Sequence, residues 1–360
     1  MTPWTPARAA EERPGSDAGS APEGAPVAAS SAAGSASAAG RSSSAAARRA
    51  RRRAVLHAAL GVAGLAGLAA LVRHAGAAAL LEALGRAAPL LPLLVVLEAA
   101  RIGCEGLATR ALCLPRRVPL AELARIHVVA YPVATLMPAG RAAAEAVKAA
   151  LLSPYVGAPR AAAIATANQS LALLSFAPTS LLAAAAVWQS DGASPLALAV
   201  LAHAAVSVAS GVGVAFAARQ RAAFAWLARR FARAGNATAA FQEAVREHPP
   251  VPLRPLAAFC AGRALQAAQY AVLLAAVGAD SGPLRALAAY GVAVIGTAVG
   301  DLIPAQIGAT DGAFTLAAPL LGLSTSAAVA VSVLAHTLQA IGALAGIVAT
   351  LVWRRPPPAA

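Results

Sequence analysis

Residues 136–145 read LMPAGRAAAE and break an apolar stretch that runs from residue 124 to residue 151. Residues 302–311 read LIPAQIGATD and break a second apolar stretch, 284–320, in the same way. In both stretches proline and glycine interrupt the helix, and an acidic residue follows the proline by seven positions. Broken helices that recur within one chain are typical of many membrane transporters. The pattern therefore predicts an internal repeat of two interrupted helices.

The composition of the 360 residues places these breaks in a membrane protein. Apolar residues make up 59% of the chain and charged residues 12%, and the mean hydropathy is +0.66. These values exclude an ordinary soluble domain and a wholly disordered chain. The net charge of +14 fits membrane topology better than nucleic-acid binding, because aromatic residues, which stack on bases, are only 4%. The three cysteines have no CxxC spacing, so neither a zinc site nor a disulfide framework is expected.

Apolar stretches long enough to span a bilayer alternate with four arginine-rich segments. The uninterrupted apolar stretches are about 54–72, 89–112, 160–188, 195–217, 255–277 and 326–353. The arginine-rich segments are 48–53, 116–125, 219–233 and 354–355. The positive-inside rule puts all four segments in the cytoplasm, so the chain crosses the membrane an even number of times between consecutive segments.

This count is met if neither interrupted stretch crosses the membrane. The stretch 124–151 then enters from the cytoplasm and returns, while 284–320 enters from the outside and returns. We therefore predict an all-α polytopic membrane protein with six full spans and two re-entrant hairpins of opposite orientation, which form an inverted repeat. Both termini are expected in the cytoplasm.

Three regions are expected along the chain. Residues 1–53 lack apolar periodicity and predict a disordered cytoplasmic tail that ends in a basic cluster. Residues 54–353 form the membrane domain. Residues 218–250 place Phe224, Leu227 and Phe231 on one helical face among arginines, which predicts a cytoplasmic helix on the anionic membrane surface. A loop helix packed on the bundle fits the same pattern.

The first hairpin carries Arg141, Glu145 and Lys148 just after its break. A helix that begins here directs main-chain N–H groups and a positive dipole end into the membrane. Together with Arg141 and Lys148 this end predicts a phosphate site. The alternative is that these side chains reach out to the headgroup level. Four residues shape the breaks of the two hairpins: Pro138, Gly140, Pro304 and Gly308.

The second hairpin carries Asp301, Gln306 and Asp311. No Arg or Lys lies between residues 286 and 353, so the two acids have no cation nearby in sequence. Ionisable residues inside membrane segments are costly and need a partner. We expect the acids to bind a cation or an amine, or to pair with Arg263 or Arg141 from another element.

Charged and polar residues also occur within the full spans. Glu98, Arg101 and Glu105 share one helical face and predict either an internal salt-bridge stack or part of a polar pathway. Further candidates for this pathway are Asn168, Gln169, Arg263 and His336. Hydrogen bonding between helices is the alternative explanation for them. No HExxH, Cys/His cluster, P-loop or GxSxG motif occurs, so no catalytic residue, metal site or cofactor is predicted.

The two hairpin sequences resemble the lysylphosphatidylglycerol synthase transmembrane-region family, also called flippase-like. The first motif of that family is similar to residues 137–148, where Ala144 replaces the usual glycine and Lys148 the usual arginine. The second is similar to residues 303–311, where aspartate replaces glutamate. His336 stands where relatives often have arginine, and residues 168–169 stand where they often have an acidic residue and arginine. The resemblance covers about 54–353.

The resemblance implies a protein of the bacterial inner membrane that moves or distributes a lipid. The full synthases carry an aminoacyl-transferase domain after the membrane region, and this sequence lacks it, so no enzymatic activity is expected. The implied partners are membrane lipids, either anionic or of polyprenyl or hopanoid type, and a lipid-modifying enzyme. Nucleic acid is not expected as a partner.

The leading functional hypothesis is translocation of a lipid between leaflets, with the headgroup passing through a polar cavity between the hairpins. Two alternatives from other classes remain. One is a non-transporting membrane partner that regulates or localises a lipid-modifying enzyme. The other is an ion-coupled secondary transporter of a small solute, in which Asp301 or Asp311 binds the coupling ion.

Overall fold

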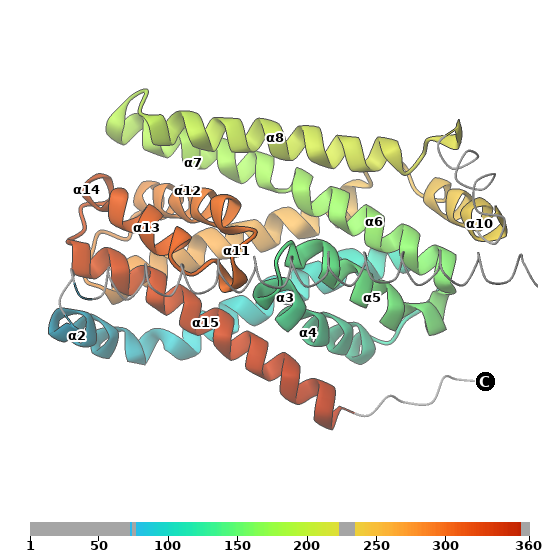
Figure 1. Cartoon of the computed structure of the whole chain (residues 1–360), viewed down its shortest axis with the longest axis horizontal. Coiled ribbons are helices and arrows are strands. Elements are labelled where there is room, and N and C mark those ends of the chain that lie inside the picture. The colour runs from blue at the N-terminus through green and yellow to red at the C-terminus, as the bar shows by residue number, and fades with distance from the viewer. Residues whose placement is uncertain (1–72, 74–76, 223–234, 354–360) are drawn as a thin grey trace, which may run out of the picture. The chain divides into compact units, whose positions relative to one another are not determined.

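The computed structural model describes residue 73 and residues 77–222 and 235–353, all within one compact unit, Val55–Ala360 (Figure 1). Every regular element among these residues is helical, as the sequence predicts. The expected tail 1–53, the first expected span 54–72, the aromatic face of 218–250 and the arginines at 354–355 lie outside the described residues.

The elements follow one another with short connections. In chain order they are α2 (Ala77–Ala87), η1 (Ala88–Leu90), α3 (Leu91–Cys113), α4 (Leu120–Leu136), α5 (Gly140–Val156), α6 (Ala158–Leu174), α7 (Phe176–Asp191), α8 (Pro195–Ala217), α10 (Gly235–Arg246), α11 (Leu253–Ala276), α12 (Pro283–Gly300), η3 (Pro304–Gln306), α13 (Ala309–Leu316), α14 (Ala318–Leu321) and α15 (Thr325–Val352).

Five helical segments of the described part are long and apolar enough to cross a membrane. They are Leu84–Cys113, Ala158–Asp191, Pro195–Ala217, Pro283–Gly300 and Thr325–Val352. Helix α11 is also long, with 24 residues, but it contains Arg254 and Arg263 and is less apolar. Helix α12 counts among the five by its 18 residues, although the chain turns back directly after it.

The first interrupted stretch forms a helical hairpin of α4 and α5. Residues between the helices turn through Ala139, which has a left-handed backbone with φ of 49°. Gly140 then lies so close to the end of α4 that a Cβ atom there would stand 2.5 Å from the carbonyl oxygens of Val133 and Ala134. Glycine is therefore required at this position, because any larger residue would push the two helices apart.

The second interrupted stretch forms a hairpin of α12 and α13 joined by η3. The turn places Ala305 and Gln306 in the left-handed region, with φ of 55° and 57°. Gly300 at the end of α12 faces Ala309 and Gln306, and a Cβ atom there would meet their Cβ atoms at 3.0 Å. Small residues thus let the two arms of this hairpin approach closely.

The tips of the two hairpins meet. The main-chain N–H of Ala139 donates a hydrogen bond to the carbonyl oxygen of Asp301, at 3.1 Å. Figure 1 shows α4 and α5 extending to one side of this junction and α12 and α13 to the other. The two hairpins therefore extend in opposite directions from the junction, and the side of the membrane from which each enters stays a prediction.

The long segment of α6 and α7 is broken at Ser175, between Leu174 and Phe176. The hydroxyl of Ser175 turns back onto the carbonyl oxygen of Ala172, at 2.8 Å. Pro178 in the first turn of α7 cannot donate to the carbonyl of Leu174 and crowds it, which interrupts the helix, and the hydroxyl-to-backbone bond of Ser175 adds to the bend. The bend positions Ser175 and Phe176 next to the charged residues described below.

Apolar side chains form two main clusters of buried residues. One contains Tyr290 and Phe314 and joins α7, α11, α12, α13 and α15, and the other contains Leu123 and Phe259 and joins α3, α4, α5, α6 and α11. On α3, the charged residues 98–105 lie between Leu94, a member of the first cluster, and Ala108, a member of the second. The charged site is therefore enclosed within the bundle.

Helix α10 covers part of the region expected as an interfacial helix. Its residues Ala244 and Val245 pack with Phe241 against Ala163 of α6. This contact fits the alternative of a loop helix packed on the bundle. Contact of residues 218–250 with a membrane surface stays a prediction.

Candidate functional site

Three charged side chains of α3 form one hydrogen-bonded stack. Arg101 donates from Nε and Nη2 to the two carboxylate oxygens of Glu98, at 2.9 and 2.7 Å. Its remaining nitrogen, Nη1, donates to Glu105, at 2.8 Å. The spacing along one helical face brings the three together, as the sequence predicts, and two acids flank one cation.

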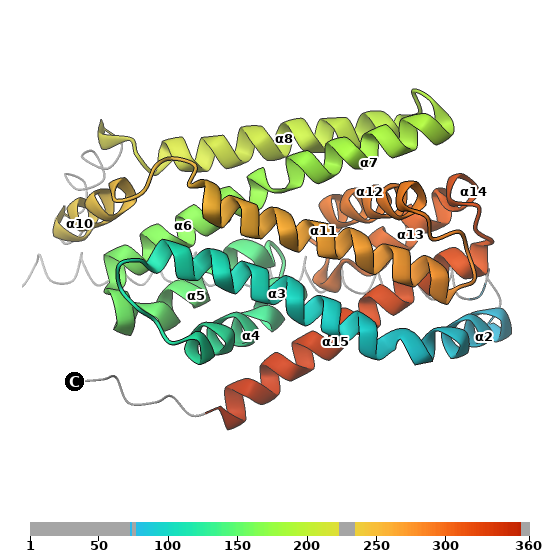
Figure 2. The ribbon, with the colours of Figure 1, turned by 180° about the vertical axis from the view of Figure 1, so that it is seen from behind.

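Glu98 also ties three helices together. Its carboxylate accepts a hydrogen bond from the Tyr131 hydroxyl of α4, at 2.7 Å, and another from the Gln269 side chain of α11, at 3.0 Å. Figure 2 shows α3 and α11 side by side along most of their lengths. Since four donors saturate Glu98, this carboxylate has a structural role in addition to any place in a pathway.

The first hairpin adds its charges to the stack. Lys148 Nζ lies 2.8 Å from Glu145 Oε1 and 3.6 Å from Glu105 Oε2. Arg141 Nη2 lies 3.9 Å from Glu105 Oε1, and its side chain is 31% exposed. The structure thus brings Arg141, Glu145 and Lys148 together with the α3 stack, across two elements that the sequence treats separately.

The pairing in this network is incomplete. Among the described residues, Glu145 Oε2 and Arg141 Nε are buried and have no hydrogen-bond partner. A buried charge that lacks part of its hydrogen bonding costs several kcal/mol. Unpaired atoms of both signs therefore mark the Arg141–Glu145 end of the network as a place where a polar ligand gains hydrogen bonds.

Arg263 of α11 stands apart from the acids. It is 4% exposed, and no carboxylate oxygen of the described residues lies within 4.0 Å of it. Its Nε donates to the Ser175 hydroxyl at 3.3 Å and its Nη1 to Gln266 at 3.0 Å, while Nη2 has no partner in the described part.

The ring of Phe176 lies against Arg263. The guanidinium carbon is 3.7 Å from the ring centroid, and the guanidinium carbon of Arg141 is 6.0 Å from the same centroid. A desolvated cation–π contact contributes about 2 kcal/mol, whereas burying an unpaired cation costs several kcal/mol. The aromatic contact offsets only part of the cost of burying Arg263.

Asp311 of the second hairpin is fully buried and has three partners, one at the start of its own helix and two on α15. It accepts hydrogen bonds from the Gly308 N–H at 2.7 Å and the Ser332 hydroxyl at 2.6 Å, and His336 Nε2 lies at 3.2 Å. Of the two alternatives for Asp311, a pair with Arg263 or Arg141 does not occur among the described residues. Its partners from another element are Ser332 and His336 of α15. The carboxylate caps the start of α13 and meets α15, because the helix begins only at Ala309. Binding of a cation or an amine stays a prediction.

Asp301 and Gln306 lie at the tip of the second hairpin. The Asp301 side chain is exposed and has no ion pair in the described part of the chain, while its carbonyl oxygen holds the tip of the first hairpin. Gln306 is half-buried and packs beside Gly300. Of the expected residues of this hairpin, only Asp311 is drawn into the bundle interior.

A second polar chain runs beside the stack. Asn168 Nδ2 donates to Thr109 Oγ1 at 2.9 Å, and Thr109 Oγ1 lies 3.0 Å from His127 Nε2. Asn168 Oδ1 and Gln169 Oε1 are buried without a described partner. His127 and Thr109 were missed from the sequence, although a histidine inside an apolar stretch is a signal for a buried polar contact.

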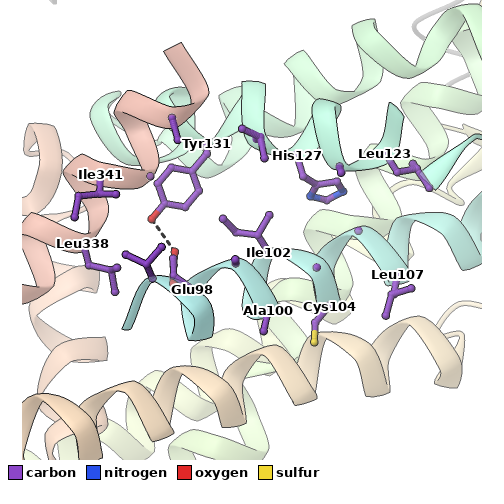
Figure 3. A pocket seen from close by; sticks show the side chains of 18 of the residues that line it. Glu98, Ala100, Ile102, Cys104, Leu107, Leu123, His127, Tyr131, Leu338 and Ile341 are labelled. Carbon is purple, nitrogen blue, oxygen red and sulfur yellow. Dashed lines mark hydrogen bonds between the residues drawn. The ribbon is translucent and has the colours of Figure 1, made fainter. Parts of the chain in front are cut away.

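A cavity of about 640 Å³ opens between α3, α4 and α15. Its walls are almost wholly apolar, for example Leu107, Leu338 and Ile341, and the Tyr131–Glu98 hydrogen bond closes one side (Figure 3). The cavity thus places an apolar volume directly against the charged stack. No group of three potential metal-binding side chains occurs in the described residues.

The family model described as the lysylphosphatidylglycerol synthase TM region matches residues 56–346. No curated protein and no solved structure gives a significant match. The matched range contains both hairpins, the charged stack and Arg263.

Proposed function

Since this chain belongs to the lysylphosphatidylglycerol synthase TM-region family, a family of membrane proteins related to lipid handling, we propose that it translocates a lipid between the leaflets of a bilayer. The observation that carries the proposal is the meeting of two oppositely oriented hairpins at their tips, through Ala139 and Asp301. Broken helices in an inverted repeat are a common way to build a site for a polar group near the middle of a membrane.

The polar headgroup would pass along the charged residues of the first hairpin. Arg141 and Glu145 are buried or half-buried and each has an unpartnered polar atom among the described residues. A headgroup that leaves water loses its hydration, and fixed charges replace part of it. We expect Glu145 to contact a cationic group and Arg141 an anionic one.

The acyl chains would stay in an apolar environment throughout. The cavity between α3, α4 and α15 has the apolar walls that hydrocarbon requires, and it adjoins the stack at Glu98 and Tyr131. A lipid placed here keeps its tails among apolar side chains while its headgroup is near charged ones. This division of the lipid supports translocation over transport of a wholly soluble solute.

The test is a leaflet-exposure assay in proteoliposomes of the full chain. A reductant added outside bleaches the fluorophore of lipids in the outer leaflet, so loss of the remaining fluorescence reports translocation from the inner leaflet. We expect Arg141→Ala to slow translocation about tenfold or more, because it removes a charge-assisted contact. Arg254→Gln is the matched control, since Arg254 is exposed on α11 and loses the same charge. Equal rates in wild type and Arg141→Ala would contradict the residue assignment, and no rate above protein-free vesicles would contradict the function.

A second candidate is ion-coupled transport of a small solute, favoured by the Asp311–His336 pair. A buried acid and histidine 3.2 Å apart in apolar helices are groups that can carry a proton. Solute uptake driven by a proton gradient, and abolished in His336→Ala, would support this candidate. A rate of lipid translocation that does not change with the proton gradient would favour lipid translocation over this second candidate.

We propose the bacterial inner membrane as the location, with both termini in the cytoplasm. The partners would be anionic, polyprenyl or hopanoid-type lipids, and a lipid-modifying enzyme for the alternative of a non-transporting partner. Single-cysteine labelling tests the topology, since reporters at the two ends should react only after the membrane is permeabilised. A lipid inventory of a deletion strain, leaflet by leaflet, tests the lipid class.

A further inference from the structure

The strongest unexplained feature of the interior is the uncompensated charge of Arg263. The buried network around α3 and α5 contains the carboxylates of Glu98, Glu105 and Glu145. The cations of the same region are Arg101, Arg141, Lys148 and Arg263. Four cations therefore face three carboxylates in the described part, and Arg263 is the cation without an acid within 4.0 Å.

The contacts of Arg263 are all with neutral groups. Ser175 and Gln266 each accept one hydrogen bond, and Phe176 stacks on the guanidinium. The nitrogen Nη2 is buried and has no described partner. A guanidinium presents five donors in a planar fork that matches a carboxylate or a phosphate, so an anion would satisfy the donors that the protein leaves over.

Arg141 adds a second donor on the same aromatic ring. Its guanidinium lies 6.0 Å from the Phe176 centroid, and its Nε has no described partner. Its ion pair with Glu105 is loose, at 3.9 Å. Lys148, by contrast, lies between Glu145 and Glu105, so its charge is already neutralised.

We propose that Arg263 and Arg141, placed around Phe176, form an oxyanion site that takes a phosphate group. The expectation that Lys148 shares this role stays a prediction, and the structure offers Arg263 as the second cation instead. If the phosphate belongs to a lipid headgroup, the site rests on the proposed translocation, and the substrate is a lipid with a phosphate in its headgroup. Free inorganic phosphate has the same chemistry and is the other source.

Ser175 and Phe176 lie where the long segment Ala158–Asp191 is interrupted, and both contact Arg263. The bend presents Ser175 Oγ to Nε and holds Phe176 against the guanidinium. With Nε and Nη1 held, the remaining donors of Arg263 have a fixed direction, which is the condition for selective anion binding.

The test is anion binding by the purified full chain in a neutral detergent. The probes are inorganic phosphate, dihexanoyl phosphatidic acid and, as the uncharged counterpart, dihexanoyl glycerol. Binding is measured by calorimetry and by the rise in melting temperature, since a ligand of the folded state stabilises it. We expect a rise with at least one phosphate-bearing probe and none with dihexanoyl glycerol.

Three variants separate the site from general electrostatics. Arg263→Gln should weaken binding of the phosphate-bearing probe about tenfold or more. Arg141→Gln should weaken binding of the same probe less than Arg263→Gln does, because Arg141 is half-buried. The same partial exposure makes replacement of Arg141 better tolerated, so this variant tests the site if Arg263→Gln does not fold. Arg254→Gln, with the same loss of charge on the exposed face of α11, should bind like wild type.

The outcomes are distinct. Binding of phosphatidic acid alone identifies a lipid headgroup, and binding of inorganic phosphate with equal affinity identifies a free anion. Equal binding by wild type, Arg263→Gln and Arg141→Gln, or an equal loss in Arg254→Gln, would overturn the site. Because anion binding is measured without a bilayer, the proposed site and the proposed translocation have separate readouts. Either proposal can therefore be contradicted while the other is supported.

Discussion

The two hairpins share a sequence pattern but use their acidic residues differently. In the first, Glu145 lies inside α5, contacts Lys148 and leaves one carboxylate oxygen without a described partner. In the second, Asp311 lies at the start of α13, and both of its oxygens are hydrogen-bonded. One acid belongs to a buried charged network in which it has an unsatisfied oxygen, while the other holds the local structure.

The difference arises from where each helix begins. Both acids follow a proline by seven residues. Helix α5 begins at Gly140, directly after the turn, so Glu145 is already one turn inside the helix. In the second hairpin η3 occupies Pro304–Gln306 and α13 begins at Ala309, so Asp311 is the third helical residue and caps the helix. Equal spacing in sequence therefore gives unequal roles.

The largest expected effect comes from the first hairpin's turn. Gly140→Ala would place a Cβ atom 2.5 Å from two main-chain oxygens of α4, which cannot move without breaking the hairpin. We expect a loss of about 3 kcal/mol in the free energy of unfolding, or failure to fold. The measurement is the thermal unfolding midpoint in detergent.

The second hairpin supplies the control for this change. Gly312 lies within α13 and has no heavy atom within 4 Å of a Cβ built on it. Gly312→Ala should be neutral or stabilise by up to about 1 kcal/mol, since alanine favours helix. If Gly140→Ala were as harmless as Gly312→Ala, the close approach of α4 and α5 would be wrong.

Removing the acid of the second hairpin should have the next largest effect. Asp311→Ala leaves the Gly308 N–H, the Ser332 hydroxyl and His336 without their acceptor. We expect a loss of about 2–3 kcal/mol in stability, because unsatisfied buried donors are costly. Ser332→Ala removes one of these bonds and should lower the free energy of unfolding by about 1 kcal/mol. If Asp311→Ala were as stable as wild type, the structural role assigned to the acid of the second hairpin would be wrong.

Removing the acid of the first hairpin should have a smaller effect on stability. In Glu145→Gln the amide oxygen still accepts from Lys148, which also has Glu105 as a partner. We expect a change of at most about 1 kcal/mol in unfolding free energy. The rate of lipid translocation in proteoliposomes should nevertheless fall. A large loss of stability with unchanged translocation would reverse the roles assigned to the two acids.

The smallest effect is expected at the exposed tip of the second hairpin. Asp301→Asn changes a side chain that is exposed and has no ion pair in the described part. Its main-chain contact with Ala139 is unaffected, so the free energy of unfolding should stay within about 0.5 kcal/mol of wild type. A strong effect on translocation without an effect on stability would assign Asp301 to substrate or ion contact.

The fold was largely predictable because membrane topology is set by coarse features. Apolar length and arginine distribution predicted four of the five candidate spans and indicated that 124–151 and 284–320 turn back. The expected span 54–72 lies outside the described residues, 255–277 is not among the five, and Pro283–Gly300 is among them although it was expected in a hairpin. The break of the long segment at Ser175 also has a signal in the sequence, because Pro178 cannot donate a hydrogen bond to the carbonyl of Leu174 and its ring crowds that carbonyl. This signal was missed when 160–188 was predicted to be uninterrupted.

The contacts of the site were predictable where both residues lie on one helix, and they were not predictable between helices. The spacing of Glu98, Arg101 and Glu105 predicted their stack, because neighbours on one helical face contact each other. The partners of Asp311 were left open by the sequence, because the helix start that makes it a cap depends on the short turn of η3. The contact of Arg263 with Phe176 joins α11 to α7 and depends on tertiary packing alone.

The junction of the two tips has a consequence for sequence variation. The bond between Ala139 and Asp301 joins a main-chain N–H to a main-chain carbonyl. Every amino acid except proline supplies that donor, and every amino acid supplies that acceptor. The left-handed backbone of Ala139 disfavours β-branched residues there, but this limit does not depend on the residue at 301. Correlated changes, from which contacts are often deduced, would therefore not reveal this one. The hairpins can diverge in side chains while the backbone keeps them joined.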